Sequence, residues 1–147
     1  MVPEIAGAGL FLDLASHTLD ILDFLLGPIS VAKGLAANQS GDHDVEDAVT
    51  AAFAFASGAL GAGSWGFSCH AREDRCEITG SRGKLAFATF GVAPIVWVSE
   101  AGTREFAIGN PRHIQQPLIQ SIVMELNGQG SCPSTGESLS IISSPDV

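Results

Sequence analysis

The chain has 147 residues and a mass of 15.2 kDa, with 46% apolar and 16% charged residues. This composition excludes intrinsic disorder and fits one domain with a buried core. Sixteen acidic against seven basic side chains give a net charge of −9, which argues against binding to nucleic acid or to anionic lipid, since both need a basic surface. We therefore expect neither nucleic acid nor membrane as a partner.

The three cysteines, Cys69, Cys76 and Cys132, cannot all pair, and no two of them form a CxxC motif. The chain also opens without the basic segment and apolar stretch of a secretory signal. We therefore expect buried, reduced thiols in a cytoplasmic protein. A zinc site at Cys69, His70 and Cys76 lacks the usual spacing and a fourth ligand, so no metal is expected.

A helix is expected from about Gly9 to Leu26, because Gly27 and Pro28 then stop it. Its leucines and Phe11 form a broad apolar face. The short polar side chains gather on the remaining arc of the helix: Asp13, Ser16, His17, Asp20 and Asp23. A second helix is expected from about Gln116 to Asn127, and the tail from Gly136 to Val147 could begin a third.

The segments between the helices have the composition and turn residues of strands: 31–38, 45–56, 59–68, 75–79, 84–90, 95–99 and 103–108. Short links join several of them, including Gly80–Gly83 and Glu100–Gly102. The prediction is an α+β fold with a mostly antiparallel open sheet of about six strands and helices on one face. Although Ala48–Ala71 is uncharged, its glycines favour two strands joined at Ser57–Gly58 over a membrane helix.

The segment Val45–Ala56 alternates between large and small side chains. Val49, Phe53 and Phe55 share one face, and alanines with Thr50 share the other. We expect the bulky side to pack on helices and the small side to meet another flat surface, such as the sheet of a second subunit. The sequence thus predicts a homodimer formed through the sheet face.

The candidate site lies on the first helix, where Asp13, His17 and Asp20 are spaced i, i+4, i+7. Histidine titrates near neutrality, and a carboxylate one turn away can orient it, so the pair could exchange protons with a substrate. An ordinary solvent-facing side is the alternative, and a metal site with a third ligand also stays open. The absence of any basic residue on this face favours a cleft.

Two loops have simpler interpretations. The acidic run Asp42–Asp47 lacks the glycine and spacing of a calcium loop, and we interpret it as a solvated loop entering a strand. The mixed charges at His70–Arg75 are typical of an ion-paired surface turn.

Gly7 to Asp20 resembles the signature of the Gfo/Idh/MocA oxidoreductases, a glycine cluster followed by D-x-x-x-H-x-x-D on a helix. Other segments agree with that family in order and spacing: Val45–Ala48, Ser57–Gly61, the E-I-x-G-x-x-G-x-L pattern at Glu77–Leu85, and Cys132-Pro133-x-x-Gly136-Glu137. The resemblance covers nearly the whole chain.

The resemblance implies that residues 1–147 form the C-terminal substrate-binding and oligomerisation domain of a two-domain enzyme, without the Rossmann domain that binds NAD or NADP. It also implies that His17 exchanges a proton with a sugar, polyol or related hydroxy compound during hydride transfer, while Asp13 orients the substrate or the imidazole. Asp20 matches the motif as a structural residue. The isolated domain would then be inactive.

A non-catalytic dimerising or ligand-binding module of the same fold is the alternative function. The sequence does not identify the substrate, the choice between NAD and NADP, or the direction of the reaction. The tail looks shorter than the last helix of the family.

Overall fold

The computed structural model describes residue 9 and residues 11–42 and 44–132, which belong to two compact units that meet in sequence at Ala71 and Arg72. The predicted α+β fold is confirmed, with antiparallel strands in both units. All seven predicted strand segments are strands. They form a three-stranded and a four-stranded sheet, where the sequence predicted one sheet of about six strands. The predicted third helix, from Gly136, lies outside the described residues.

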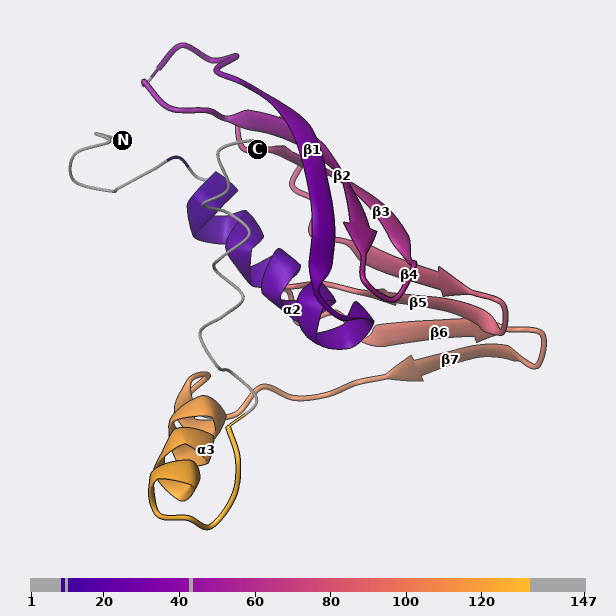
Figure 1. The fold of residues 1–147 in the computed structure, drawn as a ribbon. Coiled ribbons are helices and arrows are strands. Elements are labelled where there is room, and N and C mark those ends of the chain that lie inside the picture. The colour runs from indigo at the N-terminus through magenta and orange to yellow at the C-terminus, as the bar shows by residue number, and fades with distance from the viewer. Residues whose placement is uncertain (1–8, 10, 43, 133–147) are drawn as a thin grey trace. The chain divides into compact units, whose positions relative to one another are not determined.

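The first unit places a helix on one face of a three-stranded sheet (Figure 1). A π-helical turn, η1 (Phe11–Ala15), leads into α2 (Ser16–Leu26). The strands β1 (Ile29–Ala37), β2 (Ala48–Phe55) and β3 (Leu60–Gly66) pair in the order β1-β2-β3. The alternation of β2 is as predicted, because Val49, Phe53 and Phe55 are all buried.

The core of this unit forms between α2 and the inner face of the sheet. Leu19, Ile29, Phe53 and Phe55 are buried together, and the ring of Trp65 packs against them. Trp65 meets Phe53 edge to face at a centroid distance of 6.3 Å and Phe11 at 5.1 Å. Such aromatic contacts add to the free energy gained by burying the rings. They fasten the first turn of the helix to the last strand of the sheet.

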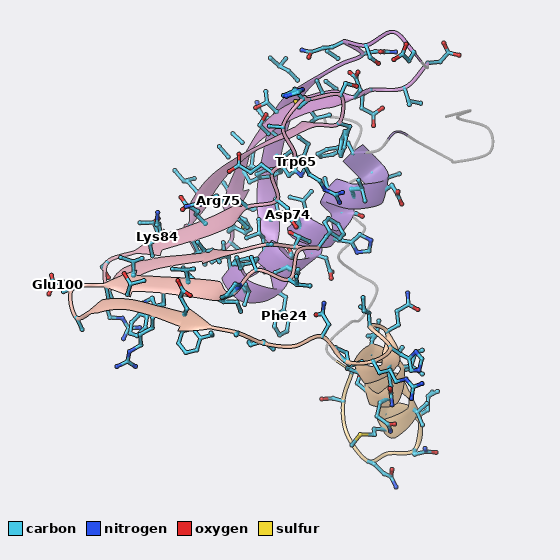
Figure 2. All side chains as sticks on the ribbon, turned by 180° about the vertical axis from the view of Figure 1, so that it is seen from behind. Phe24, Trp65, Asp74, Arg75, Lys84 and Glu100 are labelled. Atoms are coloured by element: carbon cyan, nitrogen blue, oxygen red, sulfur yellow. The ribbon has the colours of Figure 1, made fainter. Side chains whose placement is uncertain are left out.

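The end of α2 matches the prediction and gives one polar residue a structural role. Gly27 adopts a φ of 86°, a left-handed conformation that glycine tolerates best, and its N–H donates to the carbonyl of Asp23. The carboxylate of Asp23 then accepts the N–H of Ile29 over 2.9 Å. Asp23 thus secures the turn from helix to β1. Phe24 is a bulky apolar residue of α2, and its side chain points away from the core and is exposed (Figure 2).

The uncharged stretch after Ala48 forms the hairpin β2–β3, as predicted. Gly58 has a φ of 87° in the connection, and the N–H of Phe55 donates to the carbonyl of Ala59. Among the residues that the structure describes, no helix combines the length and the apolar character needed to cross a membrane.

The outward face of the three-stranded sheet, opposite α2, carries small residues and three exposed large apolar ones. Leu60 is 83% exposed, Leu35 77% and Val31 50%. The register places Lys33 beside Ala52 and Ala62 in the middle of this face, and Leu35 beside Thr50 and Ser64. We call this surface the outward sheet face; Lys33 is its one charged residue along β1, β2 and β3.

The second unit contains β4 (Cys76–Gly80), β5 (Gly83–Phe87), β6 (Ile95–Ser99) and β7 (Gly102–Phe106), paired in that order, and α3 (Gln116–Leu126). Both predicted hairpins are present. Gly83 and Gly102, which end the two turns, have φ values of 146° and 116°. Positive φ is the reason these turns favour glycine.

Charged residues stabilise the second unit, and Arg75 is the one residue of the predicted ion-paired turn that forms an ion pair in the described part of the chain, with Glu77 outside that turn. The Glu77 carboxylate contacts both Arg75 and Lys84, the latter at 2.8 Å, and these hydrogen bonds lower its pKa (Figure 2). Asp74 accepts the N–H groups of Thr89, Phe90 and Gly91. Burial acts to raise the pKa of Asp74, but these three donors and Arg72 hold it below the ordinary value. Asp74 therefore fixes the turn that follows β5.

Two expectations about polarity are wrong. Cys69 is exposed and Cys76 half-buried, so of the three free thiols only Cys132 is buried as predicted.

The acidic loop is solvated only at its start, because Val45 and Asp47 are both buried. The physical reason is that Asp47 finds enough hydrogen-bond donors to replace the water it loses.

Asp47 ties together the ends of all three strands of the first unit. Its carboxylate accepts the N–H of Gln39 at 2.6 Å, the N–H of Ser40 at 2.8 Å and the hydroxyl of Ser68 at 2.8 Å. Its own backbone pairs with Ala37 and Phe67. The backbone donors lower the pKa of Asp47 well below its usual range, so the carboxylate stays ionised although it is buried.

We predict that Asp47→Asn lowers the melting temperature at pH 7 by about 5 °C or more, because the amide places an N–H₂ group against a donor. A carboxylate with a lowered pKa stabilises the fold fully above the ordinary aspartate value of about 4, and this stabilisation is lost as the pH falls further. The difference between variant and parent should therefore be smaller at pH 3 than at pH 7.

Thermal unfolding followed by circular dichroism at both pH values measures this difference. Asp44→Asn, in the exposed part of the same loop, is the matched control and should leave the melting temperature unchanged. Equal melting temperatures for Asp47→Asn and the parent at pH 7 would contradict the role given to Asp47.

Candidate functional site

The predicted site residues lie on the first helix of the chain, on the side turned away from the core. Asp13 belongs to η1 and His17 to the first turn of α2, and both side chains are exposed. Ala15 and Leu19, on the opposite side, are buried. The polar residues therefore lie on the exposed side of the helix, and the cleft that the sequence favours at this face stays a prediction.

The helix begins differently from the prediction. A continuous α-helix was expected, but Phe11–Ala15 forms a π-helical turn. An α turn has slightly fewer than four residues and a π turn slightly more, so two residues that are four apart lie about one turn from each other in either case. Asp13 and His17 therefore keep a common side of the helix. The hydroxyl of Ser16 donates to the carbonyl of Asp13 at 3.2 Å and supports the backbone at this turn.

The start of the helix is packed against the side chain of Glu46. A β-carbon built on Gly9 would overlap the Glu46 carboxylate, so this side chain lies directly against the Gly9 backbone. The carbonyl of Gly9 accepts the N–H of Asp13 at 3.4 Å. A carboxylate beside the first turn of a helix is favoured by the helix dipole. Glu46 therefore lies at the start of the segment that carries Asp13.

The backbone of Glu46 lies between two buried residues. Val45 and Asp47 flank it in sequence, and Asp47 is fixed by its three hydrogen bonds. The sequence did not indicate the burial of Asp47 or the contact of Glu46 with Gly9, because the whole acidic run was interpreted as solvated. The available signal was the alternation of β2, which extends backward through Asp47 and Val45 on the buried side.

The site offers a base and an acid, but no nearby arrangement for a metal. Among the residues that the structure describes, no three His, Cys, Asp or Glu side chains gather in a way that could hold a metal ion. Neutral imidazole accepts a proton and imidazolium donates one, so His17 can exchange protons with a hydroxyl or carbonyl group. Asp20 is also exposed on this side of α2.

A protein-family model described as the GFO/IDH/MocA C-terminal domain matches residues 1–86. Oxidoreductase P35 of Formosa agariphila is 31% identical over 144 residues. These residues make up 96% of this chain but only 43% of that relative. The chain thus spans less than half the length of the curated relative it matches.

Solved structures agree on the fold. An oxidoreductase from Agrobacterium radiobacter, in complex with NAD⁺, L-tartaric acid and magnesium, superposes with a TM-score of 0.71 at 17% identity. The superposed region covers 88% of this chain and 42% of the oxidoreductase chain. A levoglucosan dehydrogenase, in complex with NADH and levoglucosan, gives a TM-score of 0.64 at 25% identity. The matched region covers 73% of this chain and 33% of the dehydrogenase chain.

We predict that Gly9→Ala and Glu46→Ala are energetically coupled. The added methyl group displaces the Glu46 carboxylate, so Gly9→Ala should destabilise the parent more than it destabilises a chain that already carries Glu46→Ala. A double-mutant cycle by urea unfolding should give a coupling of about 0.5 kcal/mol or more, as for residues in direct contact. Strictly additive changes would show that the two residues are independent.

Proposed function

Because this chain belongs to the GFO/IDH/MocA family, we propose that it is the substrate-binding and oligomerisation domain of an oxidoreductase that transfers a hydride between NAD(P) and a sugar, polyol or related hydroxy compound. The observation that carries the proposal is the polar side of the first helix, where His17 and Asp13 are exposed one turn apart. The domain on its own is then inactive.

His17 is proposed to move the proton that accompanies the hydride. When an alcohol is oxidised, the hydride leaves carbon with its electron pair and the hydroxyl proton must leave oxygen. A neutral imidazole accepts that proton, and in the reverse direction the imidazolium returns it to the carbonyl oxygen. The bound nicotinamide accepts or supplies the hydride.

Asp13 is proposed to orient either the substrate hydroxyl or the imidazole. A carboxylate one turn from a histidine can accept a hydrogen bond from a ring N–H or from a substrate hydroxyl. Its place in η1, whose start is packed on Glu46, gives this carboxylate a defined backbone. Asp20 has a supporting role in the same polar side.

The exposure of both groups fits a site that is completed by another domain. The relative is more than twice as long as this chain, so most of its length has no counterpart here. We propose that a dinucleotide-binding domain in the longer protein covers the polar side of the helix and brings the nicotinamide to it. We propose a cytoplasmic location, because the three cysteines form no disulfide among the described residues.

The second candidate is a dimerising or ligand-binding module without catalysis. The outward sheet face favours this candidate, because a surface that binds a second copy is sufficient for a domain whose role is to form a dimer. Both candidates predict a homodimer, so the role of His17 must separate them.

We predict that His17→Ala lowers kcat of the full-length oxidoreductase by roughly 10²–10⁴, because the proton then has no positioned acceptor. The measurement is NAD(P)-dependent turnover of a panel of sugars and polyols by spectrophotometry. His70→Ala, which removes an exposed imidazole from a loop, is the control and should retain full activity. If His17→Ala retains the parent rate, the proton role is wrong; if the parent turns over no substrate, the non-catalytic module is favoured.

We predict that the 147-residue chain is a dimer by light scattering and that Leu60→Glu makes it a monomer, because a carboxylate then enters the outward sheet face. Leu60 is highly exposed, so the substitution should leave the melting temperature of the monomer unchanged. Val92→Glu, at an equally exposed residue of the second unit, should stay dimeric. A monomeric parent at high concentration would contradict the interface.

A further inference from the structure

Phe24 lies on the same side of α2 as His17 and Asp20. An α-helix has about 3.6 residues per turn, so the seven residues from His17 to Phe24 make about two turns and the four from Asp20 make about one. All three residues belong to one regular α-helix, Ser16–Leu26, so their common side follows from the helix itself. The polar side that carries the proposed site therefore includes a phenyl ring.

The core side of α2 lies opposite this phenyl ring. Leu19 is buried, and Leu22 and Leu26 pack against the core cluster of the first unit. Leu22 and Leu26 are each two residues from Phe24, which is about 200° around the helix. The Phe24 side chain accordingly points away from the core of its own unit (Figure 2). Since burial of a phenyl ring is strongly favourable, a role outside this core has to account for it.

The side chains on this side of α2 match the two kinds of surface that a sugar presents. A sugar ring carries hydroxyl groups around its edge and apolar C–H groups on its faces. The imidazole of His17 and the carboxylate of Asp20 can form hydrogen bonds with hydroxyl groups. The phenyl ring of Phe24 can pack on an apolar C–H face, as aromatic side chains do in ligand sites that also carry a few polar groups.

The separation between His17 and Phe24 indicates the size of the ligand. Seven residues of α-helix extend about 10 Å along the helix axis. Side chains on one side of a helix lean in the same direction, so the imidazole and the phenyl ring keep a similar separation. A single sugar ring with a hydroxyl group at His17 does not extend that far, whereas a second ring joined to it does.

We propose that Phe24 binds the second ring of a two-ring substrate, a sugar that is joined to another sugar or to an aromatic group. This inference rests on the proposed function, in which His17 exchanges a proton with the reacting ring. The reacting ring lies beside Asp13 and His17, and the second ring packs on the phenyl group of Phe24. Phe24 determines specificity for two-ring substrates and takes no part in proton or hydride transfer.

The test measures kcat and KM of the full-length oxidoreductase for matched single-ring and two-ring substrates. Each sugar of the panel is paired with a disaccharide and a phenyl glycoside that contain it, such as glucose with cellobiose and phenyl β-glucoside. Phe24→Ala removes the ring, and Phe24→Tyr keeps it. Leu25→Ala is the matched control, because it shortens an exposed apolar side chain about 100° away around the helix. The melting temperature of each variant is measured in parallel.

We expect Phe24→Ala to raise KM for the two-ring substrates roughly 10-fold, because the packing of the second ring is lost. The kcat of this variant and its KM for single-ring sugars should equal those of the parent. Phe24→Tyr and Leu25→Ala should match the parent with every substrate, and all melting temperatures should be unchanged.

An unchanged KM of Phe24→Ala for two-ring substrates would overturn the inference. Equal losses with both kinds of substrate, or a lower melting temperature, would also overturn it and would assign Phe24 to a contact within the protein. A parent that turns over only single-ring sugars would overturn it while the proposed function stands. If the parent turns over nothing in the panel, the proposed function fails and this inference fails with it.

Discussion

The buried carboxylate of Asp47 is the constraint on which the first unit depends. It joins the loop after β1, the entry of β2 and the segment after β3 through three hydrogen bonds to one side chain. An ionised group that has lost its water must be satisfied completely, so none of these segments can shift without a cost in free energy. Glu46 directly precedes Asp47 in the chain, and its side chain lies against the backbone of Gly9, just before the first helix.

The contacts at the inner side and at the start of the first helix set the position of its polar side. The aromatic cluster of Trp65, Phe11 and Phe53 packs on the inner side of the helix. The side chain of Glu46 lies against Gly9, just before the helix begins. Asp13 and His17 then project from a helix that is held at two points. In the proposed function His17 exchanges a proton, and such a group would benefit from this support, since small displacements of reacting groups reduce rates strongly.

The local patterns of the sequence predicted most elements because each depends on neighbouring residues. Gly27 and Pro28 ended the helix, the large-and-small alternation set the buried side of β2, and glycines marked the hairpins. The division into two sheets depends on long-range pairing that no local pattern encodes. Asp47 was missed because an acid in an acidic run looks solvated, and only the fold supplies its donors. The polar side of the helix was predicted, whereas its completion by a second domain stays a proposal.

Lys33 gives the outward sheet face a further property. It lies in the middle of β1, which is an edge strand of the three-stranded sheet, among small uncharged neighbours. Charged side chains on an exposed edge strand, lysine above all, are one of the features by which natural sheets avoid pairing with another chain. Lys33 is therefore the residue of β1 that acts against edge-to-edge growth of this sheet.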